Sequence, residues 1–170
     1  MKIFVLIIIT LIMTSCTSLP EKITPVDDFD LNKYMGTWYE IARLDHRFER
    51  GLEKVTATYH MNPDGSVRVE NKGFSTTSNK WKSIIGKAKF TGDKTAGSLK
   101  VSFFGPFYGP YLIFELDKVG YQYAFVTSGE NYLWLLARSS TVSNALKEKF
   151  VRTAKDAGYN TEELIFVNQE

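Results

Sequence analysis

The chain has 170 residues, a length that suits one domain with a sizeable core. Its 21 basic and 19 acidic side chains give a net charge of only +2, so the composition does not indicate a nucleic-acid partner. The single cysteine excludes an intramolecular disulfide. The aromatic residues (12 Phe, 9 Tyr and 3 Trp) favour strands over helices.

Residues 1–15 are predicted to be a lipoprotein signal peptide. Lys2 supplies a positive start, and Ile3–Met13 is apolar apart from one threonine, which is short for a bilayer span and typical of a secretory signal. The sequence Met-Thr-Ser-Cys that ends at Cys16 resembles a bacterial lipoprotein cleavage site, where the cysteine is lipidated. We therefore expect lipidation at Cys16, and several acyl chains there would hold the protein at a membrane.

The stretch that follows Cys16 is predicted to be a lipidated tether over residues 16–30, because it contains two prolines and shows no periodicity. Thr17 stands where an aspartate would resemble a signal for retention in the inner membrane. The outer membrane, with the protein facing the periplasm, is therefore the expected location. A short helical turn follows, with Asp30 as its N-cap.

Short strand-like segments dominate the rest of the chain, and no βαβ alternation interrupts them. The clearest pair is a hairpin around the turn Asn62–Gly65. We expect a loop over Gly105–Pro110, where two glycines and two prolines cluster. The eight predicted strands are Trp38–Leu44, Val55–Met61, Ser66–Phe74, Trp81–Thr91, Leu99–Phe104, Tyr111–Leu116, Tyr121–Thr127 and Tyr132–Arg138. Such a series favours a sandwich or an up-and-down barrel.

After Ser140 the pattern changes to apolar residues spaced by three and four, which predicts one amphipathic helix. Ser140 or Thr141 can cap its start, and Gly158 occupies the position of a C′ glycine. Its apolar face needs a surface to cover, and the outside of the barrel is available. Glu163–Val167 is expected to be a short final strand.

Several long segments resemble bacterial lipocalins, beginning with GTWYEIARLDHRFERGL at Gly36 and continuing with LKVSFFGPFYGPY and YLWLLAR. The resemblance implies an all-β fold: an eight-stranded antiparallel up-and-down β-barrel over residues 31–170, with one C-terminal amphipathic α-helix packed outside and a short final strand. It also implies structural roles for Gly36, Trp38 and Arg138, because the arginine packs across the tryptophan at the closed end of the barrel.

Alternation along the strands predicts which side chains point into the barrel. The register of the family adds Tyr111 and Ala124, and also turns Glu115 inward. The expected lumen is apolar with few polar groups, which suits a long apolar ligand with a small polar head. The expected ligand-binding residues are Ala57, Tyr59, Asn71, Phe103, Tyr111, Ala124 and Trp134.

The function implied by the resemblance is a membrane-anchored lipid-binding protein that binds or carries fatty acids or lysophospholipids in the cell envelope. The alternative is a lipid-modifying enzyme of the lipocalin type, and haem binding is weaker because neither histidine maps to the lumen. We expect no catalytic residue, cofactor, metal or nucleic-acid partner, and a homodimer is consistent with the chain. The charged loop Asp45–Gly51 is expected at the barrel mouth, where basic residues can meet an anionic head: Arg43, Arg47, Arg50 and Lys54.

Overall fold

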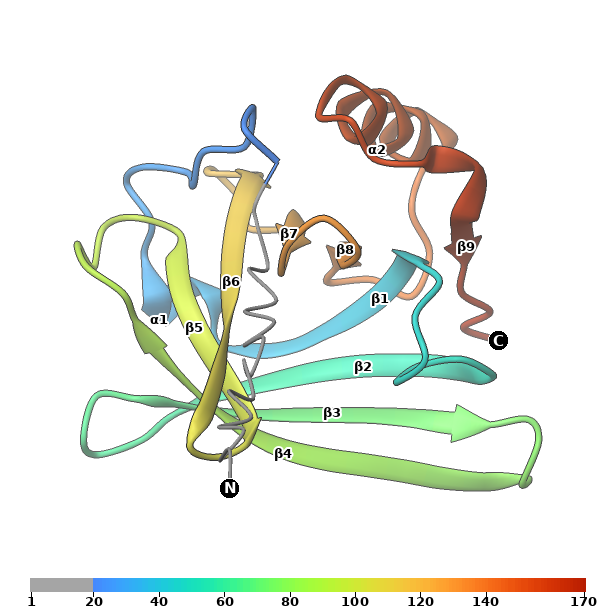
Figure 1. The fold of residues 1–170 in the computed structure, drawn as a ribbon, viewed down its shortest axis with the longest axis horizontal. Helices are drawn as coiled ribbons and strands as arrows, with labels where there is room; N and C mark the ends of the chain where they lie inside the picture. Colours follow the sequence, from blue (N-terminus) through green and yellow to red (C-terminus); the bar gives the residue numbers. More distant parts are fainter. Residues whose placement is uncertain (1–19) are drawn as a thin grey trace, which may run out of the picture.

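The computed structural model describes residues 20–170; the expected signal peptide and the lipidation site Cys16 lie outside this range. The described chain contains a short helix, eight long strands, a second helix and a final strand (Figure 1). The elements are α1 (Leu31–Tyr34), β1 (Gly36–Leu44), β2 (Leu52–Met61), β3 (Val67–Ser75), β4 (Lys80–Phe90), β5 (Ser98–Phe104), β6 (Phe107–Leu116), β7 (Tyr123–Thr127), β8 (Leu133–Ala137), α2 (Asn144–Asp156), the 3₁₀ helix η1 (Thr161–Glu163) and β9 (Leu164–Phe166).

The strands β1 to β8 close into an antiparallel barrel in chain order, because β1 pairs with both β8 and β2. β1 pairs with β2 only through its first residues, and farther along it pairs with β9. There the C-terminal segment lies between β1 and β2, since the Gln169 side chain donates to the carbonyls of Glu40 in β1 and Val55 in β2 at 2.7 and 3.0 Å. The predicted barrel with one final strand is confirmed.

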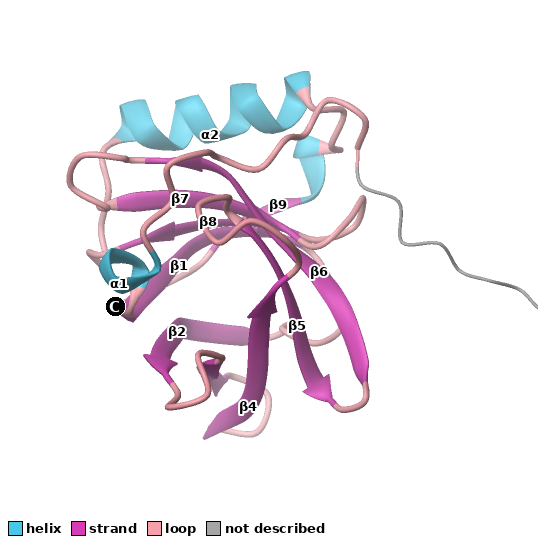
Figure 2. Cartoon of the chain, turned by 90° about the vertical axis from the view of Figure 1, so that its left-hand side faces the viewer, coloured by secondary structure: helices cyan, strands magenta, loops and turns pink. Residues whose placement is uncertain are grey.

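Two separate apolar clusters organise the domain. One fills the barrel interior, and the other lies between the outside of the barrel and α2. Figure 2 shows α2 lying across the outside of the strands. Phe150 of α2 is fully buried against Phe125 of β7, with ring centroids 5.0 Å apart. The external position predicted for this helix is confirmed. Within residues 20–170, neither α-helix is long and apolar enough to cross a membrane.

Local details of the sequence prediction need correction at the helix start and at one loop. Ser143, not Ser140 or Thr141, caps α2 by accepting a hydrogen bond from the Leu146 amide. The expected loop Gly105–Pro110 is reduced to a turn, because β6 already begins at Phe107. Its aromatic residues extend the strand, and Pro110 is tolerated beside an irregular section of the β5–β6 ladder.

Part of the expected tether belongs to the folded body. Ile23 and Phe29 are buried, one against the cluster beneath α2 and the other in the barrel interior. The Val26 amide donates to the Ile113 carbonyl, and the Val26 carbonyl accepts from Gly97. From Pro20 onward the chain is therefore held on the barrel instead of hanging free.

Glu115 does not face the lumen, contrary to the register we expected. A bulge between Ile113 and Glu115 in the β6–β7 ladder puts an extra residue on the outer face. Glu115 consequently pairs with Lys149 of α2 and accepts a bond from the Tyr123 hydroxyl. It is part of the contact between the helix and the barrel.

Arg138 and Trp38 close the end of the barrel next to α1. The guanidinium carbon lies 3.9 Å from the centre of the Trp38 ring, which is completely buried. Gly36 has φ +92°, and a Cβ there would lie 3.4 Å from an Arg138 nitrogen. The Trp38 indole donates to the Tyr34 carbonyl at 2.8 Å. The guanidinium itself donates, at 2.7–2.9 Å, to the carbonyls of Lys33, Met35 and Thr37.

We expect Trp38→Ala to lower the free energy of unfolding by about 3–5 kcal/mol and Arg138→Ala by about 1–3 kcal/mol. Arg138→Lys keeps the charge but loses the planar fork, so it should recover less than half of the Arg138→Ala loss. Urea unfolding followed by circular dichroism measures these changes. Lys155→Ala, which removes an exposed cation from α2, is the control and should stay within about 0.5 kcal/mol. Equal stability of Arg138→Ala and the unmodified protein would contradict the role of this closure.

Candidate functional site: the barrel lumen

Three tyrosines form the floor of the lumen. Tyr34 comes from α1, Tyr59 from β2 and Tyr111 from β6, and the Tyr111 hydroxyl lies 2.8 and 2.7 Å from the other two. Burial raises the pKa of Tyr59 to about 12, so this phenol stays protonated at neutral pH. The cavity beside them measures only about 10 Å³, about enough for one water. The floor is thus filled by side chains, and a lipid chain cannot extend past it.

The lumen is more open above this floor. We call this part the upper lumen; it is lined by Asn71, Ile84, Phe103 and Trp134, none of which is fully buried. Asn71 and Ile84 are direct partners in the β3–β4 ladder and so share one face. Phe103 lies against Gly86, where a Cβ would come within 2.7 Å of its ring, so this glycine makes room for the phenyl group.

Asn71 places one unpartnered polar atom in this apolar wall. Its Oδ1 is buried, and no residue in the described chain donates to it. The opposite position on β2 is Ala57, whose methyl group has nothing to donate. A buried acceptor without a partner costs about 1–3 kcal/mol, and a ligand that brings a donor would recover that energy.

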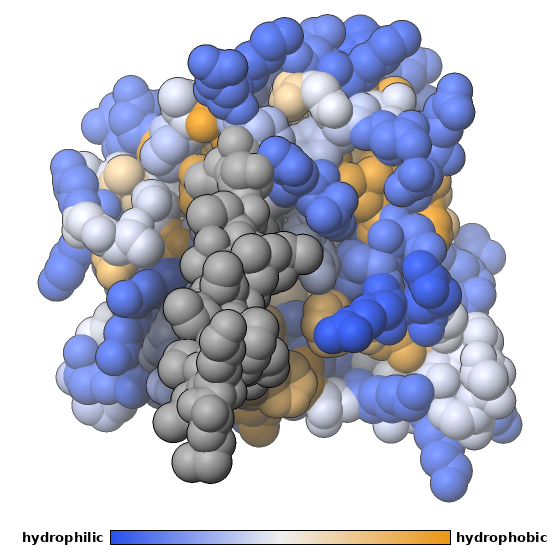
Figure 3. Space-filling model, in the orientation of Figure 1, coloured by the Kyte–Doolittle hydropathy of each residue, from blue (hydrophilic) through white to orange (hydrophobic). Residues whose placement is uncertain are grey.

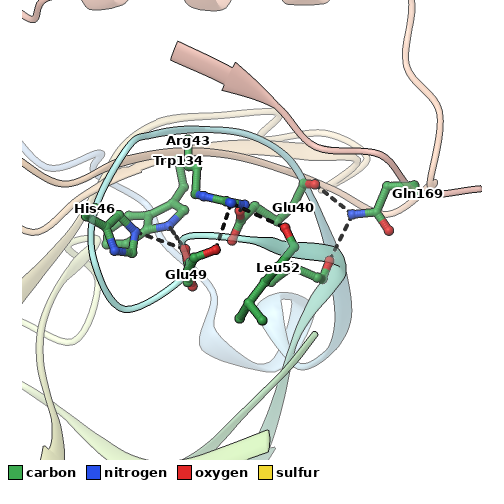
Figure 4. Close-up of polar contacts among 8 residues, drawn as sticks. Glu40, Arg43, His46, Glu49, Leu52, Trp134 and Gln169 are labelled. Atoms are coloured by element: carbon green, nitrogen blue, oxygen red, sulfur yellow. Dashed lines mark hydrogen bonds and ion pairs between the residues drawn. The ribbon is translucent and has the colours of Figure 1, made fainter. Parts of the chain in front are cut away.

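A buried charged cluster lines the β1 side of the lumen. We call it the mouth cluster; it consists of Glu40, Arg43, His46 and Glu49 (Figure 4). Glu40 pairs in register with Leu136, a residue of the interior cluster, and Arg43 pairs with Trp134. Because paired residues share a face, both charged side chains point toward the interior.

Arg43 joins the strand to the loop that follows it. Its guanidinium donates to Glu40 Oε1 at 2.7 Å and to the backbone carbonyls of Glu49 and Leu52 at 2.8 and 3.3 Å. These bonds fold the loop back over the mouth. Glu49 accepts from the Trp134 indole at 3.1 Å. His46 Nε2 lies 2.9 Å from Glu49 Oε2, an ion-pair distance, although its N–H is not directed along a hydrogen bond to that oxygen.

The two carboxyl groups of the mouth cluster have pKa values shifted in opposite directions. Burial raises the pKa of Glu40 well above its usual 4.5, and the charge of Glu49 raises it further, against the pull of Arg43. Burial also acts to raise the pKa of Glu49, but the close contact with His46 and its charge, together with the hydrogen bond from the Trp134 indole, lower that pKa overall. The pair therefore tends to hold one proton, on Glu40.

The loop Asp45–Gly51 offers fewer free cations than expected. Arg43 is buried, and its two terminal guanidinium nitrogens are already hydrogen-bonded. Arg50 forms a bidentate pair with Asp45. Arg47 lies 4.8 Å from the Phe48 ring centre. Within the described residues, Arg47 and Lys54 are the two of the four basic residues without a carboxylate partner.

The seven predicted ligand-binding residues come together, but at two depths. Ala57, Tyr59 and Ala124 are buried members of the interior cluster, while Phe103, Tyr111 and Trp134 pack against it and are less deeply buried. Asn71 borders them through its partner Ala57. Sequence reasoning missed Glu40 and Arg43 as lumen residues. It also wrongly placed His46 away from the lumen, since this histidine is buried beside Trp134. Alternation along β1 could have placed Glu40 on the same inward face as Trp38. The bulge after Glu40 changes that alternation, so it gives no correct face for Arg43.

Comparison with known proteins identifies the family to which this barrel belongs. A model of the lipocalin-like domain matches residues 29–169. The chain therefore belongs to the lipocalin family, as its sequence indicated. The outer membrane lipoprotein Blc of Vibrio cholerae is 50% identical over 172 residues, which cover 100% of both chains. The Blc of Escherichia coli is 48% identical over 151 residues, covering 88% of this chain and 85% of that protein.

More distant proteins share the fold. Temperature-induced lipocalin-1 of Arabidopsis thaliana is 31% identical over 151 residues, covering 82% of this chain and 78% of that protein. Among solved structures, insecticyanin from the tobacco hornworm Manduca sexta superimposes with a TM-score of 0.70 at 21% identity, covering 89% of this chain and 86% of that one. At that identity the likeness shows the fold alone.

The mouth cluster predicts a specific dependence of stability on pH. The folded pKa of Glu40 lies above the unfolded value, so its stabilising effect is complete below pH 4.5 and is lost as the pH rises through the folded pKa. Relative to Glu40→Gln, the unmodified protein should therefore lose stability above pH 4.5. The loss amounts to about 1.4 kcal/mol for each unit by which the folded pKa of Glu40 exceeds its unfolded pKa.

Urea unfolding of both proteins between acid and mildly alkaline pH measures this difference. Glu148→Gln, which removes an exposed carboxylate from α2, is the matched control. A difference between the unmodified protein and Glu40→Gln that stays constant with pH would show that folding does not shift the pKa of Glu40.

Proposed function

We propose that this protein binds one single-chain lipid in the upper lumen and holds it at the cell envelope, with lysophospholipids preferred over fatty acids. The acyl chain lies along Ile84, Phe103 and Trp134, and the tyrosine floor limits its depth. Burial of apolar ligand surface contributes about 25 cal/mol per Å², less the entropy lost in ordering the chain.

The unpartnered Asn71 Oδ1 is the observation that carries the preference. It accepts a hydrogen bond and so selects a ligand that donates one. The carboxylate of an ionised fatty acid has no proton to give, whereas the glycerol of a lysophospholipid carries a free hydroxyl group. The phosphate of that ligand then lies toward the open end, where Arg47 and Lys54 are the cations without a carboxylate partner in the described chain.

Location and anchoring follow the close relatives. The two Blc proteins are named as outer membrane lipoproteins, which supports the outer membrane for this chain too. The proposed anchor is lipid on Cys16. Since Ile23 and Phe29 are fixed on the barrel, the anchor would join the body near the Pro20 end of the described chain.

The family and the names of the relatives indicate binding rather than catalysis. We propose that the lipid is held without conversion, so an extracted or added lysophospholipid should remain intact. A steady release of fatty acid from stoichiometric lysophospholipid would instead favour the lipid-modifying alternative.

Asn71→Leu should weaken lysophospholipid binding about five- to tenfold, because one hydrogen bond to a buried acceptor is worth about 1–1.5 kcal/mol. Fatty acid binding should change less than twofold, which makes the fatty acid the internal control for folding and lumen shape. Isothermal titration with both lipids gives the two affinities. Equal losses of affinity for both lipids would show that Asn71 shapes the lumen wall and forms no hydrogen bond to the lysophospholipid.

A plug in the upper lumen tests where the ligand lies. Ala57→Trp introduces a large ring opposite Asn71, so it should abolish binding of a fluorescent fatty acid while the barrel remains folded. In the unmodified protein Trp134 should change its emission when lipid binds, and Trp134→Phe should remove most of that change. Arg68→Gln, on the outer face of β3, is the matched control and should bind normally. Normal binding by folded Ala57→Trp would place the ligand outside the barrel.

A further inference from the structure

Large apolar side chains come to the surface together on β4 and at the β5–β6 turn. Trp81 and Ile85 of β4 are 53% and 54% exposed, and Phe104 and Phe107 beside the turn are 65% and 79% exposed. We call these four residues the β4–β6 patch. Single exposed apolar residues are ordinary, but a group of this kind marks a site of interaction.

The strand register shows that the patch is continuous. Lys87 of β4 pairs with Ser102 of β5. Because the two strands are antiparallel, moving two residues back along β4 and two residues forward along β5 brings Ile85 beside Phe104. Phe104 in turn pairs with Phe107 across the turn. Trp81 lies four residues before Ile85 on the same face of β4.

Basic side chains surround the patch. The Nζ of Lys72 lies 4.7 Å from the Trp81 ring centre, and the Nζ of Lys100 lies 5.3 Å from that of Tyr108, the residue after Phe107. On the outer face of β4, which carries Trp81 and Ile85, the charged residues are Lys87 and Lys89. Lys87 pairs with Asp64, while Lys89 forms no ion pair within the described residues. Figure 3 shows hydrophilic residues over most of the displayed surface, with hydrophobic residues emerging in limited areas.

We propose that the β4–β6 patch docks on the surface of a lipid bilayer that contains anionic lipid. Tryptophan, phenylalanine and lysine side chains side by side match the interface of a bilayer, where aromatic rings enter the headgroup layer and cations remain at the phosphates. A second copy of this chain fits less well. A twofold contact through the patch would set its lysines against their own copies, and like charges in an interface are unfavourable.

The location of the patch relates it to the lumen. In an up-and-down barrel the β3–β4 and β5–β6 turns lie at the same end as the β1–β2 loop, opposite α1. Docking through the patch therefore brings the open end to the bilayer. A lipid chain can then pass between bilayer and upper lumen with little exposure to water. The docking itself requires no lumen ligand, so it can be tested separately from the proposed function.

Trp81 provides a direct test in the full chain. The protein has three tryptophans; Trp38 is completely buried and Trp134 lines the upper lumen, so Trp81 is the exposed one. The full chain is added to vesicles of brominated phosphatidylcholine, with or without phosphatidylglycerol, and quenching of tryptophan emission is measured. We expect quenching in the anionic vesicles, with loss of that signal in Trp81→Phe and a strong decrease at high salt.

Charge reversal tests the electrostatic part of the proposal. Each of Lys89→Glu and Lys100→Glu should lower the membrane-contacting fraction about fivefold or more, since one basic residue near an anionic surface is worth about that factor. Lys155→Glu on α2 and Val119→Asp, which changes a 93% exposed residue in the β6–β7 turn, are the matched controls and should keep full quenching. Unquenched Trp81 in anionic vesicles would overturn the proposal. So would a vesicle-independent shift of Trp81 emission that grows with protein concentration, which would identify a second copy as the partner.

Discussion

The limited interior of an eight-stranded barrel is the constraint on which the rest of this structure depends. A barrel of this size is wide enough either to be filled by its own side chains or to hold one small ligand. Here the two outcomes occupy different depths. Tyr34, Tyr59 and Tyr111 fill the floor and leave about 10 Å³, whereas the walls nearer the open end keep part of their surface accessible. The closure by Trp38 and Arg138 below the floor then serves stability, and the proposed ligand binding falls to the upper lumen.

The mouth cluster shows how charge is accommodated beside an apolar site. Arg43 is almost completely buried, and an isolated charge there would be very unfavourable. Its bonds to Glu40 and to two loop carbonyls satisfy the guanidinium, and the same bonds hold the β1–β2 loop. The nearby Glu49 carboxylate supplies the opposite charge. The raised pKa of Glu40 and the lowered pKa of Glu49 let two close carboxyl groups coexist with one proton between them. Folding of the loop and protonation of the cluster are thus linked.

Much of the fold could be predicted from the sequence, because strand alternation and helical spacing are strong local signals. Alternation placed Ala57 and Tyr59 inside, and the resemblance placed Arg138 beside Trp38. The errors arose where long-range pairing overrides local pattern. Glu115 points outward because of a bulge in the β6–β7 ladder, which a single strand does not reveal.

The same reason explains the incomplete prediction of the site. Alternation indicates which face a residue occupies, but the filling of the lumen depends on side chains from α1, β2 and β6 that meet only in the closed barrel. The unpartnered state of Asn71 Oδ1 likewise depends on what all neighbouring strands present to it. Both facts decide which ligand fits, and both require the structure.

Native mass spectrometry of the protein extracted from membranes with its ligand is the decisive measurement for lipid binding in the upper lumen. We expect one bound lipid per barrel, with the mass of a lysophospholipid, retained by the unmodified protein and absent from Ala57→Trp. A folded barrel that carries no lipid, or an Ala57→Trp protein that carries the same lipid in the same amount, would contradict it.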